Sequence, residues 1–301
     1  MQTQLHFQPI EQIEADVLAI VAFDQEGGGK TPAADAVNRH TGAWLDEIRA
    51  AGEFSGTHSE TATLHRPAGL KAKRLLVAGA GASDKFDPPA LRNLVGAVIR
   101  ELKPRNARRV ALVLETPFDG AEFVSAAVEG AILGEFETDR HKTDPKKSEK
   151  GVDSFTLVVP GGAASLEKAF EAGRIVAESQ NFAREVANEP ANLLTPTTLA
   201  EHARRMAAEN GLEFEVLDQD RMRQLGMGSL LGVAQGSAEP PALIILRYKP
   251  AAAAAGKDHL GLVGKGVTFD TGGISIKPAE GMEKMKYDMA GGAAVLGAMR
   301  A

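Results

Sequence analysis

The sequence predicts an α/β protein of two domains, and three observations lead to this prediction. Apolar runs typical of buried strands alternate with helical patterns through the first half of the chain, an order that favours a largely parallel sheet. The length of 301 residues corresponds to about two domains. Gly161-Gly162 then precedes a long helical pattern, which we interpret as a connector between the domains.

Composition narrows the class of protein. The apolar fraction of 44% and the length are sufficient for a sizeable core, and the net charge of −6 argues against a general binder of nucleic acids or acidic membranes. The sequence has no cysteine, so any metal must be held by oxygen and nitrogen donors. No apolar run approaches the ~18 residues that span a bilayer, and the N-terminus lacks the pattern of a signal peptide. We therefore expect a cytoplasmic protein.

In the first half, each apolar run predicts a strand and each longer amphipathic or small-residue stretch a helix. The predicted strands are residues 15–23, 74–79, 109–115 and 155–159. The predicted helices are residues 32–51, 88–102 and 120–136. Trp44 lies on the apolar side of the first helix, which favours a place in the core.

Two patterns in this half could suggest a ligand site. Gly79-Ala80-Gly81-Ala82-Ser83-Asp84 follows a strand, but Asp84 replaces the third glycine of a dinucleotide fingerprint, which favours a plain glycine-rich turn. Residues 138–151 are strongly charged and are predicted to be a solvated loop. His141, in that loop, has no second histidine at metal-ligand spacing.

The second half begins with a long helix that we expect Ser165 to cap and that stops before the turn at Asn188. Thr195 and Pro196 start a further helix, and Gly211 ends it. The other predicted elements are strands at 212–217 and 241–248, helix turning to strand at 225–236, a loop at 250–258 and a helix at 291–301. The expected domains are 1–162, a linker helix 163–187, and 188–301.

The stretch with the most chemistry is Gly264–Gly273. The apolar run 260–263 is predicted to be a buried strand that delivers Lys265 and Asp270 to a glycine-rich turn. Lys277 and Asp288 follow within the same part of the chain.

Two interpretations of this stretch remain open from spacing alone. Carboxylates converging from different loops hold hard divalent cations, so Asp270 and Asp288 could bind metal, with Lys265 as a neutral ligand. Lys277 would then stay charged and stabilise an oxyanion. Alternatively, the two lysines form buried salt bridges with the two aspartates.

Two other motifs are excluded by particular residues. A phosphate-binding loop would need glycine at position 259 and serine or threonine at 266, where the chain has His259 and Gly266. Phe269-Asp270-Thr271-Gly272 resembles an aspartic protease motif, but the sequence has no second Asp-Thr-Gly or Asp-Ser-Gly and its pattern is α/β.

The segments VGKGVTFDTGGISIKP and GMEKMKYDMAGGAAVLGAM closely resemble the leucyl (cytosol) aminopeptidases, a family of two-metal metallopeptidases. AREVANEPANLLTPTTLA and LGMGSLLGVAQGSAEPPALIILRY extend the resemblance, which is strong over residues 182–301. Residues 1 to 160 resemble the family's more variable N-terminal domain. The resemblance implies a macro-like N-terminal α/β domain and an incomplete C-terminal α/β metallopeptidase domain.

The resemblance also implies roles for the four residues. Lys265 matches a ligand of one metal, Asp270 the carboxylate that bridges both metals, and Asp288 a second ligand of the lysine-bound metal. Lys277 matches the catalytic lysine that contacts the substrate carbonyl. The implied reaction is removal of the N-terminal residue, leucine among others, from peptides with a free N-terminus. Relatives use Zn²⁺, Mn²⁺ or Mg²⁺ and assemble as hexamers.

One departure from the family limits these expectations. The remaining metal ligands, and an arginine that holds a bicarbonate, lie in an Asn-Thr-Asp-Ala-Glu-Gly-Arg motif that this sequence does not contain. We therefore expect a C-terminally truncated aminopeptidase chain that binds metal weakly and hydrolyses nothing by itself. The alternative hypothesis is a non-catalytic role, with the N-terminal domain as a binding or assembly module.

Overall fold

A computed structural model of the chain describes residues 1–24, 31–143, 151–250 and 259–301. The chain forms two compact units, Met1–Glu178 and Ser179–Ala301, and each is described by itself. The division between the units lies inside the helix that was predicted to connect the domains. Most of the predicted loop 250–258 and half of the charged loop 138–151 lie outside the described residues.

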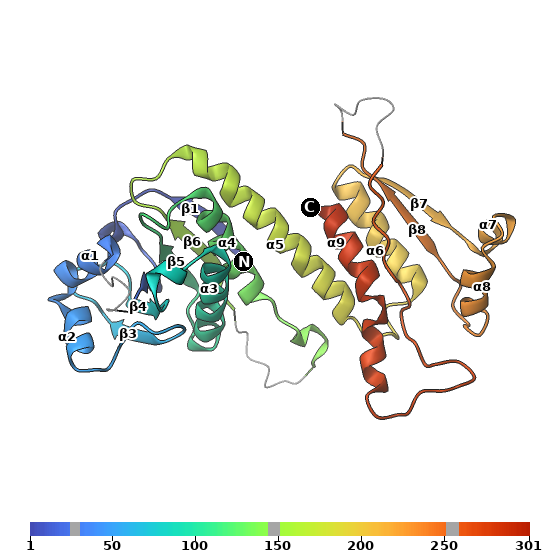
Figure 1. Ribbon diagram of the computed structural model, residues 1–301, viewed down its shortest axis with the longest axis horizontal. Coiled ribbons are helices and arrows are strands. Elements are labelled where there is room, and N and C mark those ends of the chain that lie inside the picture. Colours follow the sequence, from blue (N-terminus) through green and yellow to red (C-terminus); the bar gives the residue numbers. More distant parts are fainter. Residues whose placement is uncertain (25–30, 144–150, 251–258) are drawn as a thin grey trace. The chain divides into compact units, whose positions relative to one another are not determined.

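The first unit contains a six-stranded sheet with the strand order β1-β6-β5-β2-β4-β3 (Figure 1). Its strands are β1 (Gln2–His6), β2 (Val17–Ala22), β3 (Thr61–His65), β4 (Arg74–Gly79), β5 (Arg109–Val113) and β6 (Ser154–Val158). All neighbouring pairs are parallel except β3 with β4, which is antiparallel. The prediction of a largely parallel sheet is confirmed, although the sequence analysis missed both edge strands, β1 and β3.

Helices connect these strands. They are α1 (Pro32–Thr41), α2 (Trp44–Ala50), α3 (Pro88–Leu102), α4 (Ala121–Glu135) and α5 (Glu167–Asn188), with short 3₁₀ turns at Ile10–Gln12, Ser83–Lys85, Lys103–Arg105, Asp139–His141 and Ala164–Leu166. The single helix predicted over 32–51 is two helices, because Gly42 and Ala43 take left-handed backbone angles. Ser165 was predicted to cap α5, and this prediction is wrong because Ser165 lies within the 3₁₀ turn that precedes the helix.

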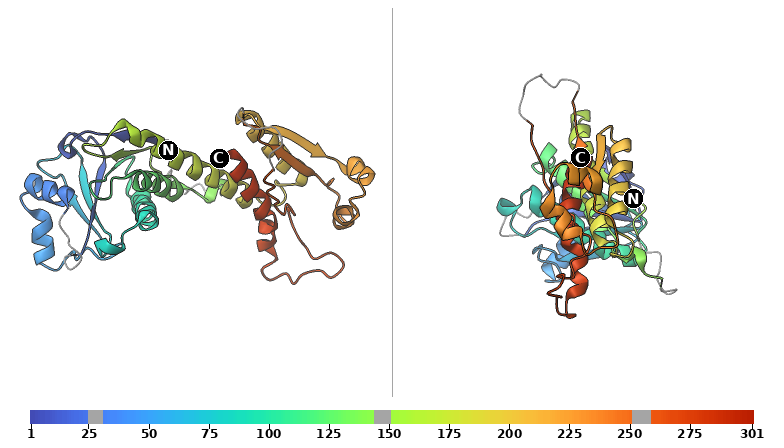
Figure 2. Two further views of the ribbon diagram at one scale, coloured as in Figure 1. Left: turned by 45° about the horizontal axis from the view of Figure 1, so that its top comes forward. Right: turned by 90° about the vertical axis from the view of Figure 1, so that its right-hand side faces the viewer.

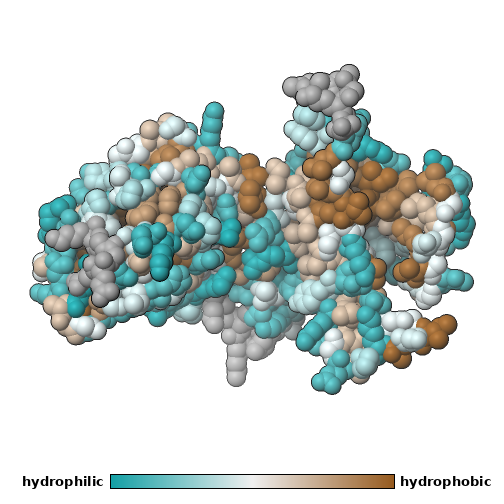
Figure 3. Space-filling model, viewed as in Figure 1, coloured by the Kyte–Doolittle hydropathy of each residue, from teal (hydrophilic) through white to brown (hydrophobic). Residues whose placement is uncertain are grey.

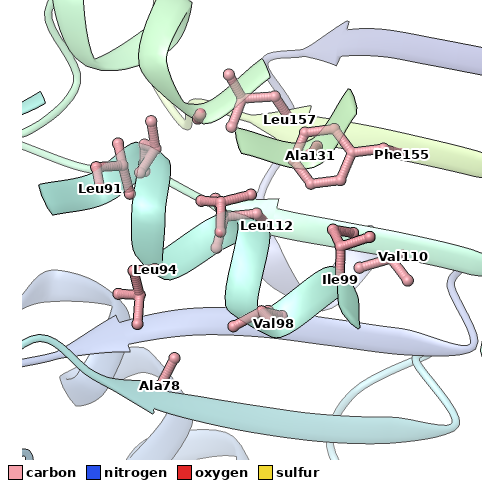
Figure 4. Close-up of a cluster of buried hydrophobic side chains, with 14 of the residues drawn as sticks. Ala78, Leu91, Leu94, Val98, Ile99, Val110, Leu112, Ala131, Phe155 and Leu157 are labelled. Carbon is pink, nitrogen blue, oxygen red and sulfur yellow. The ribbon is translucent and has the colours of Figure 1, made fainter. Parts of the chain in front are cut away.

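Strand β2 runs through the middle of the core, and all six of its residues are buried. Val17, Ala19 and Val21 belong to one hydrophobic cluster, and the alternate residues belong to another on the opposite face. Figure 4 shows part of the first cluster, where Leu91, Leu94 and Val98 of α3 pack against the sheet. The predicted burial on both faces is confirmed, and Trp44 packs partly buried against the second cluster.

The glycine-rich turn after β4 is explained by packing. A Cβ added to Gly79 would lie 2.1 Å from the carbonyl oxygen of Thr57, and Gly81 has a φ of +74°. The glycines of this turn therefore allow close packing against the chain's own backbone, which agrees with the interpretation as a plain glycine-rich turn.

The second unit has a two-stranded antiparallel sheet of β7 (Glu213–Leu217) and β8 (Leu243–Arg247). Its other elements are the end of α5, α6 (Pro196–Glu209), α7 (Gln219–Gln224), α8 (Gly228–Ala234), the 3₁₀ helix η6 (Met282–Met289) and α9 (Ala290–Arg300). A small core joins α5, α6 and α9, with Val186, Leu199 and Leu296 among its members. The predicted cap at Thr195 is confirmed as a capping box with Thr198, whereas the strand expected near the end of 225–236 is absent from these described residues.

The buried strand predicted at 260–263 is wrong. Leu260 is 88% exposed and Val263 97% exposed, and this segment pairs with neither strand of the unit among the described residues. An apolar run is buried only where neighbouring elements cover it, and here none of the described elements does. Both views in Figure 2 show residues 259–281, in orange to red, as an extended loop that leads into η6.

Candidate functional site

Lys265 is positioned where the extended segment crosses the start of α9. The amide of Gly292 donates to the carbonyl of Lys265 at 2.7 Å. A Cβ added to Gly264 would lie 2.4 Å from the carbonyl oxygen of Gly291, so a side chain at 264 cannot be accommodated without a backbone shift. The glycines therefore allow the backbone of Lys265 to lie directly against the helix that follows Asp288.

Lys265 and Asp288 form an ion pair, with 2.8 Å between Nζ and Oδ1. The lysine side chain is 59% exposed, whereas the aspartate side chain is only 20% exposed. The second carboxylate oxygen, Oδ2 of Asp288, is buried and has no hydrogen-bond partner. Such an orphaned acceptor is costly in a folded protein, and each one calls for an explanation.

Asp270 pairs with the other lysine of the motif. Its Oδ2 lies 2.9 Å from Nζ of Lys277, and its Oδ1 accepts a hydrogen bond of 2.9 Å from the amide of Gly272. The amide of Lys277 donates to the carbonyl of Thr271 at 2.8 Å, so a tight chain reversal brings the lysine back to the aspartate. Gly272, with a φ of +94°, makes this reversal, which an L side chain would strain.

The electrostatics of the two pairs are coupled. The hydrogen bond from Lys277, followed by the amide of Gly272, holds the pKa of Asp270 below its ordinary value, and the charge of Lys265 contributes to the same shift. The hydrogen bond with Asp288 raises the pKa of Lys265, and Asp270 adds to this effect. All four predicted residues therefore lie in one local field with balanced charge.

This geometry corresponds to the salt-bridge interpretation, except that the pairs are partly exposed rather than buried. The two aspartates are ligands of the kind that hard cations prefer, and one of them, Asp288, has a buried oxygen without a hydrogen-bond partner. The residues present thus fit a metal, although no group of three or more His, Asp or Glu side chains that could hold one occurs within the described ranges.

The structure adds two residues that the sequence analysis did not single out. Lys277 Nζ lies 3.2 Å from Sδ of Met285, and Nζ of Lys286 hydrogen-bonds with Asn188. Both residues belong to η6, the 3₁₀ helix that carries Asp288. Their position inside the family-like segment GMEKMKYDM was the available signal, but spacing alone assigns them no contact.

Comparison with known families matches residues 181–301 to the catalytic domain of the cytosol aminopeptidase family and residues 17–145 to its N-terminal domain. The chain belongs to the cytosol aminopeptidase family. Both segments of the expected resemblance are therefore confirmed, and so is the two-domain α/β class, with the catalytic domain matched in part.

Curated relatives agree with this assignment. A probable cytosol aminopeptidase of Solibacter usitatus is 55% identical over 301 residues, which is 100% of this chain and 59% of the relative. One of Koribacter versatilis is 43% identical over 96% of this chain and 60% of its own length. The chain thus spans about three fifths of the length of the curated relatives it matches.

Solved structures show the same fold. A tomato leucine aminopeptidase mutant matches with a TM-score of 0.82 and 30% identity, over 100% of this chain and 58% of that one. The bottromycin maturation enzyme BotP in complex with Mn matches with a TM-score of 0.74 and 30% identity, over 95% of this chain and 55% of that one.

In the parts of the chain that are described, the helices are too short or too polar to cross a membrane.

Proposed function

We propose that this chain carries part of the two-metal site of an aminopeptidase that removes the N-terminal residue from peptides. The observation that supports this most directly is the grouping of Lys265, Asp270, Lys277 and Asp288, with one buried Asp288 oxygen left without a partner. Family membership and the names of the relatives point to the same reaction.

In this proposal three residues hold metal. Asp270 would serve both cations, and Lys265 and Asp288 would hold one of them. Bound there, the cations would supply an activated water molecule and polarisation of the scissile carbonyl. Lys265 can coordinate only through a neutral Nζ, so it must release its extra proton, and its 59% exposure gives that proton a direct route to solvent.

Lys277 acts on the substrate rather than on the metal. Its side chain is 35% exposed, and its Nζ–H groups, which pair with Asp270 in this structure, would donate to the oxygen of the scissile carbonyl if Asp270 held a cation. A fixed cation beside an oxygen that becomes negatively charged stabilises the transition state, and one such donor typically raises kcat by roughly 10²–10³. Met285 contacts Nζ of Lys277 and restricts the positions that this ammonium group can take.

Several properties of the whole protein belong to the same proposal. We infer Mn²⁺, Zn²⁺ or Mg²⁺ as the metal, and the Mn-bound state of the structural relative supports the first of these. A bicarbonate, a homohexamer and the release of leucine among other N-terminal residues follow from the family resemblance. The relatives' name, cytosol aminopeptidase, supports a cytoplasmic location. The domain boundaries at residues 162 and 187 are proposed from the Gly161-Gly162 pair and the long helical pattern that follows it.

The test is hydrolysis of a leucine anilide by the chain extended to the length of its relatives. We expect Lys277→Ala to lower kcat by roughly 10²–10³. Combining it with Asp270→Ala should abolish measurable activity, whereas Lys284→Ala, which changes an exposed lysine of the nearby 3₁₀ helix η6, should not. Robust activity in the double variant would refute the proposal.

The 301-residue chain provides a second measurement. With only Lys265, Asp270 and Asp288 as protein ligands, we expect it to bind metal weakly and to release no leucine from the anilide. Rapid release by the pure chain would show that the reaction needs no further ligands, and the assignment of the site would have to change.

A further inference from the structure

Lys286 forms a clamp between the 3₁₀ helix η6 and the end of α5. Its Nζ donates to the carbonyl oxygen of Asn188 at 3.2 Å and to the side-chain oxygen of the same residue at 3.3 Å. The ammonium group also lies 4.8 Å from the ring centroid of Tyr287. Lys286 is half-buried, so these contacts are made in a partly desolvated position.

The acceptor is well suited to a cation. Asn188 is the last residue of α5, and the final carbonyls of a helix have no partner within the helix and carry its negative partial charge. The turn that follows is itself fixed, because His202 Nε2 lies 3.3 Å from Oε2 of Glu189 and the amide of Leu193 donates to Pro190. Lys286 therefore binds a part of the second unit that other contacts hold in place.

The element on the other side of the clamp is weak. Helix η6 spans eight residues as 3₁₀ helix, whereas most 3₁₀ runs extend over only about 3–4 residues because their hydrogen bonds are poorly aligned. Glu283 and Lys284 are exposed, and only Met289, at its end, is buried. Asp288 lies two positions after Lys286 on this element, and its buried Oδ2 depends on the placement of the backbone.

We propose that Lys286 is a positioning residue for Asp288. By fixing η6 to the end of α5, it holds the Asp288 carboxylate in the orientation that leaves Oδ2 free for a cation. This inference rests on the proposed metal site, to which it adds a residue that touches neither metal nor substrate. Residues of this kind typically contribute 10–100-fold to metal affinity.

The experiment is a titration of the 301-residue chain with Mn²⁺, followed by electron paramagnetic resonance of the free ion. We expect Lys286→Ala to weaken Mn²⁺ binding about tenfold. Lys286→Arg should keep the affinity near that of the parent chain, because the guanidinium is still a cation that can donate to the last carbonyl of α5. Lys284→Ala is the matched control on the same helix and should bind Mn²⁺ as the parent does.

Hydrogen exchange provides a readout that is independent of metal. In the metal-free chain, Lys286→Ala should speed amide exchange across residues 282–289, and Lys284→Ala should not. Asn188→Ala removes one of the two acceptors and keeps the carbonyl, so it should give a smaller loss of affinity. It also serves as a milder variant if Lys286→Ala perturbs folding, which circular dichroism would reveal.

The outcomes separate the two proposals. Mn²⁺ binding that Lys286→Ala leaves unchanged overturns the positioning role and leaves the metal site intact. A parent chain that binds no Mn²⁺ overturns the metal site of this chain, and the positioning role with it. A tenfold loss in Lys286→Ala together with retention in Lys286→Arg supports both.

Discussion

The two units of this chain treat apolar residues differently. In Met1–Glu178, β2 is buried along its whole length between two hydrophobic clusters. Among the described residues of this unit, the exposed large apolar side chains are Met1 and Val176. In Ser179–Ala301, one small cluster serves as the core, and eleven large apolar side chains are exposed among the described residues: Leu193, Val216, Leu225, Val233, Tyr248, Leu260, Leu262, Val263, Ile274, Ile276 and Tyr287. Brown surface over this unit is visible in Figure 3.

This contrast shows that an apolar run in a sequence indicates a tendency to be buried, but does not show that neighbouring elements are present to bury it. The runs 15–23 and 260–263 look alike in sequence. The first has parallel neighbours on both sides, β4 and β5, and is buried. The second has no strand neighbour among the described residues and is exposed.

The largest expected difference between the units is the cost of shortening a large apolar side chain to alanine. Leu112, in β5, is 2% exposed within the first core, so Leu112→Ala should lower the free energy of unfolding by about 2–5 kcal/mol. Val263→Ala, at a side chain 97% exposed, should change it by less than about 0.5 kcal/mol. Urea unfolding, followed for each unit by hydrogen exchange, measures both. A costly Val263→Ala would mean that the run 260–263 is covered in solution, and the contrast would fail.

A second prediction concerns the carboxylate that joins the strands of the first unit. Asp16 is 8% exposed, and its Oδ2 accepts from the amides of Arg108 and Arg109, while Oδ1 lies 2.8 Å from Nζ of Lys73. Burial would raise its pKa, but the hydrogen bond from Lys73 and those from the two amides outweigh burial and hold the pKa below its ordinary value. We expect Asp16→Asn to cost about 1–3 kcal/mol at neutral pH.

The sign of the pH dependence follows from the lowered pKa. The stabilisation from Asp16 is present above the pKa of the unfolded chain and is lost as the pH falls through the lower pKa of the folded one. Thermal unfolding between neutral and acidic pH should therefore show a gap between parent and Asp16→Asn that closes in acid. Glu14→Gln, at a side chain 71% exposed, is the control and should show no gap. A gap that stays constant with pH would exclude an electrostatic role for Asp16.

A smaller loss than at Leu112 or Asp16 is expected at a helix cap of the second unit. The side-chain oxygen of Thr195 accepts from the amide of Thr198, and the side-chain oxygen of Thr198 accepts from the amide of Thr195. Thr195→Ala should cost about 1 kcal/mol and should speed hydrogen exchange in the first turn of α6. The β-strands of the first unit should be unaffected, and a change there would show that the two units unfold as one.

The sequence predicted the interior of the first unit well, because its central strands are continuous apolar runs with a single favourable state. It missed β1 and β3, whose residues QTQLH and TATLH mix polar and apolar side chains, as edge strands often do. It grouped Lys265, Asp270, Lys277 and Asp288 by motif but could not tell which lysine meets which aspartate. That pairing depends on the reversal at Gly272 and on the crossing at Gly264, which are properties of the folded backbone.

The crossing at Gly264 has a consequence for mutational tolerance. Adding a single methyl group at this position would place it 2.4 Å from a backbone oxygen of α9, and the obstacle is main chain that cannot rotate away. The position of the backbone beside Lys265 thus depends on Gly264 having no Cβ, as well as on the charged side chains. Among variants that keep all four charged residues, those with any larger residue at 264 must shift the extended segment or the helix. The set of sequences compatible with this site is therefore narrower than its chemistry alone requires.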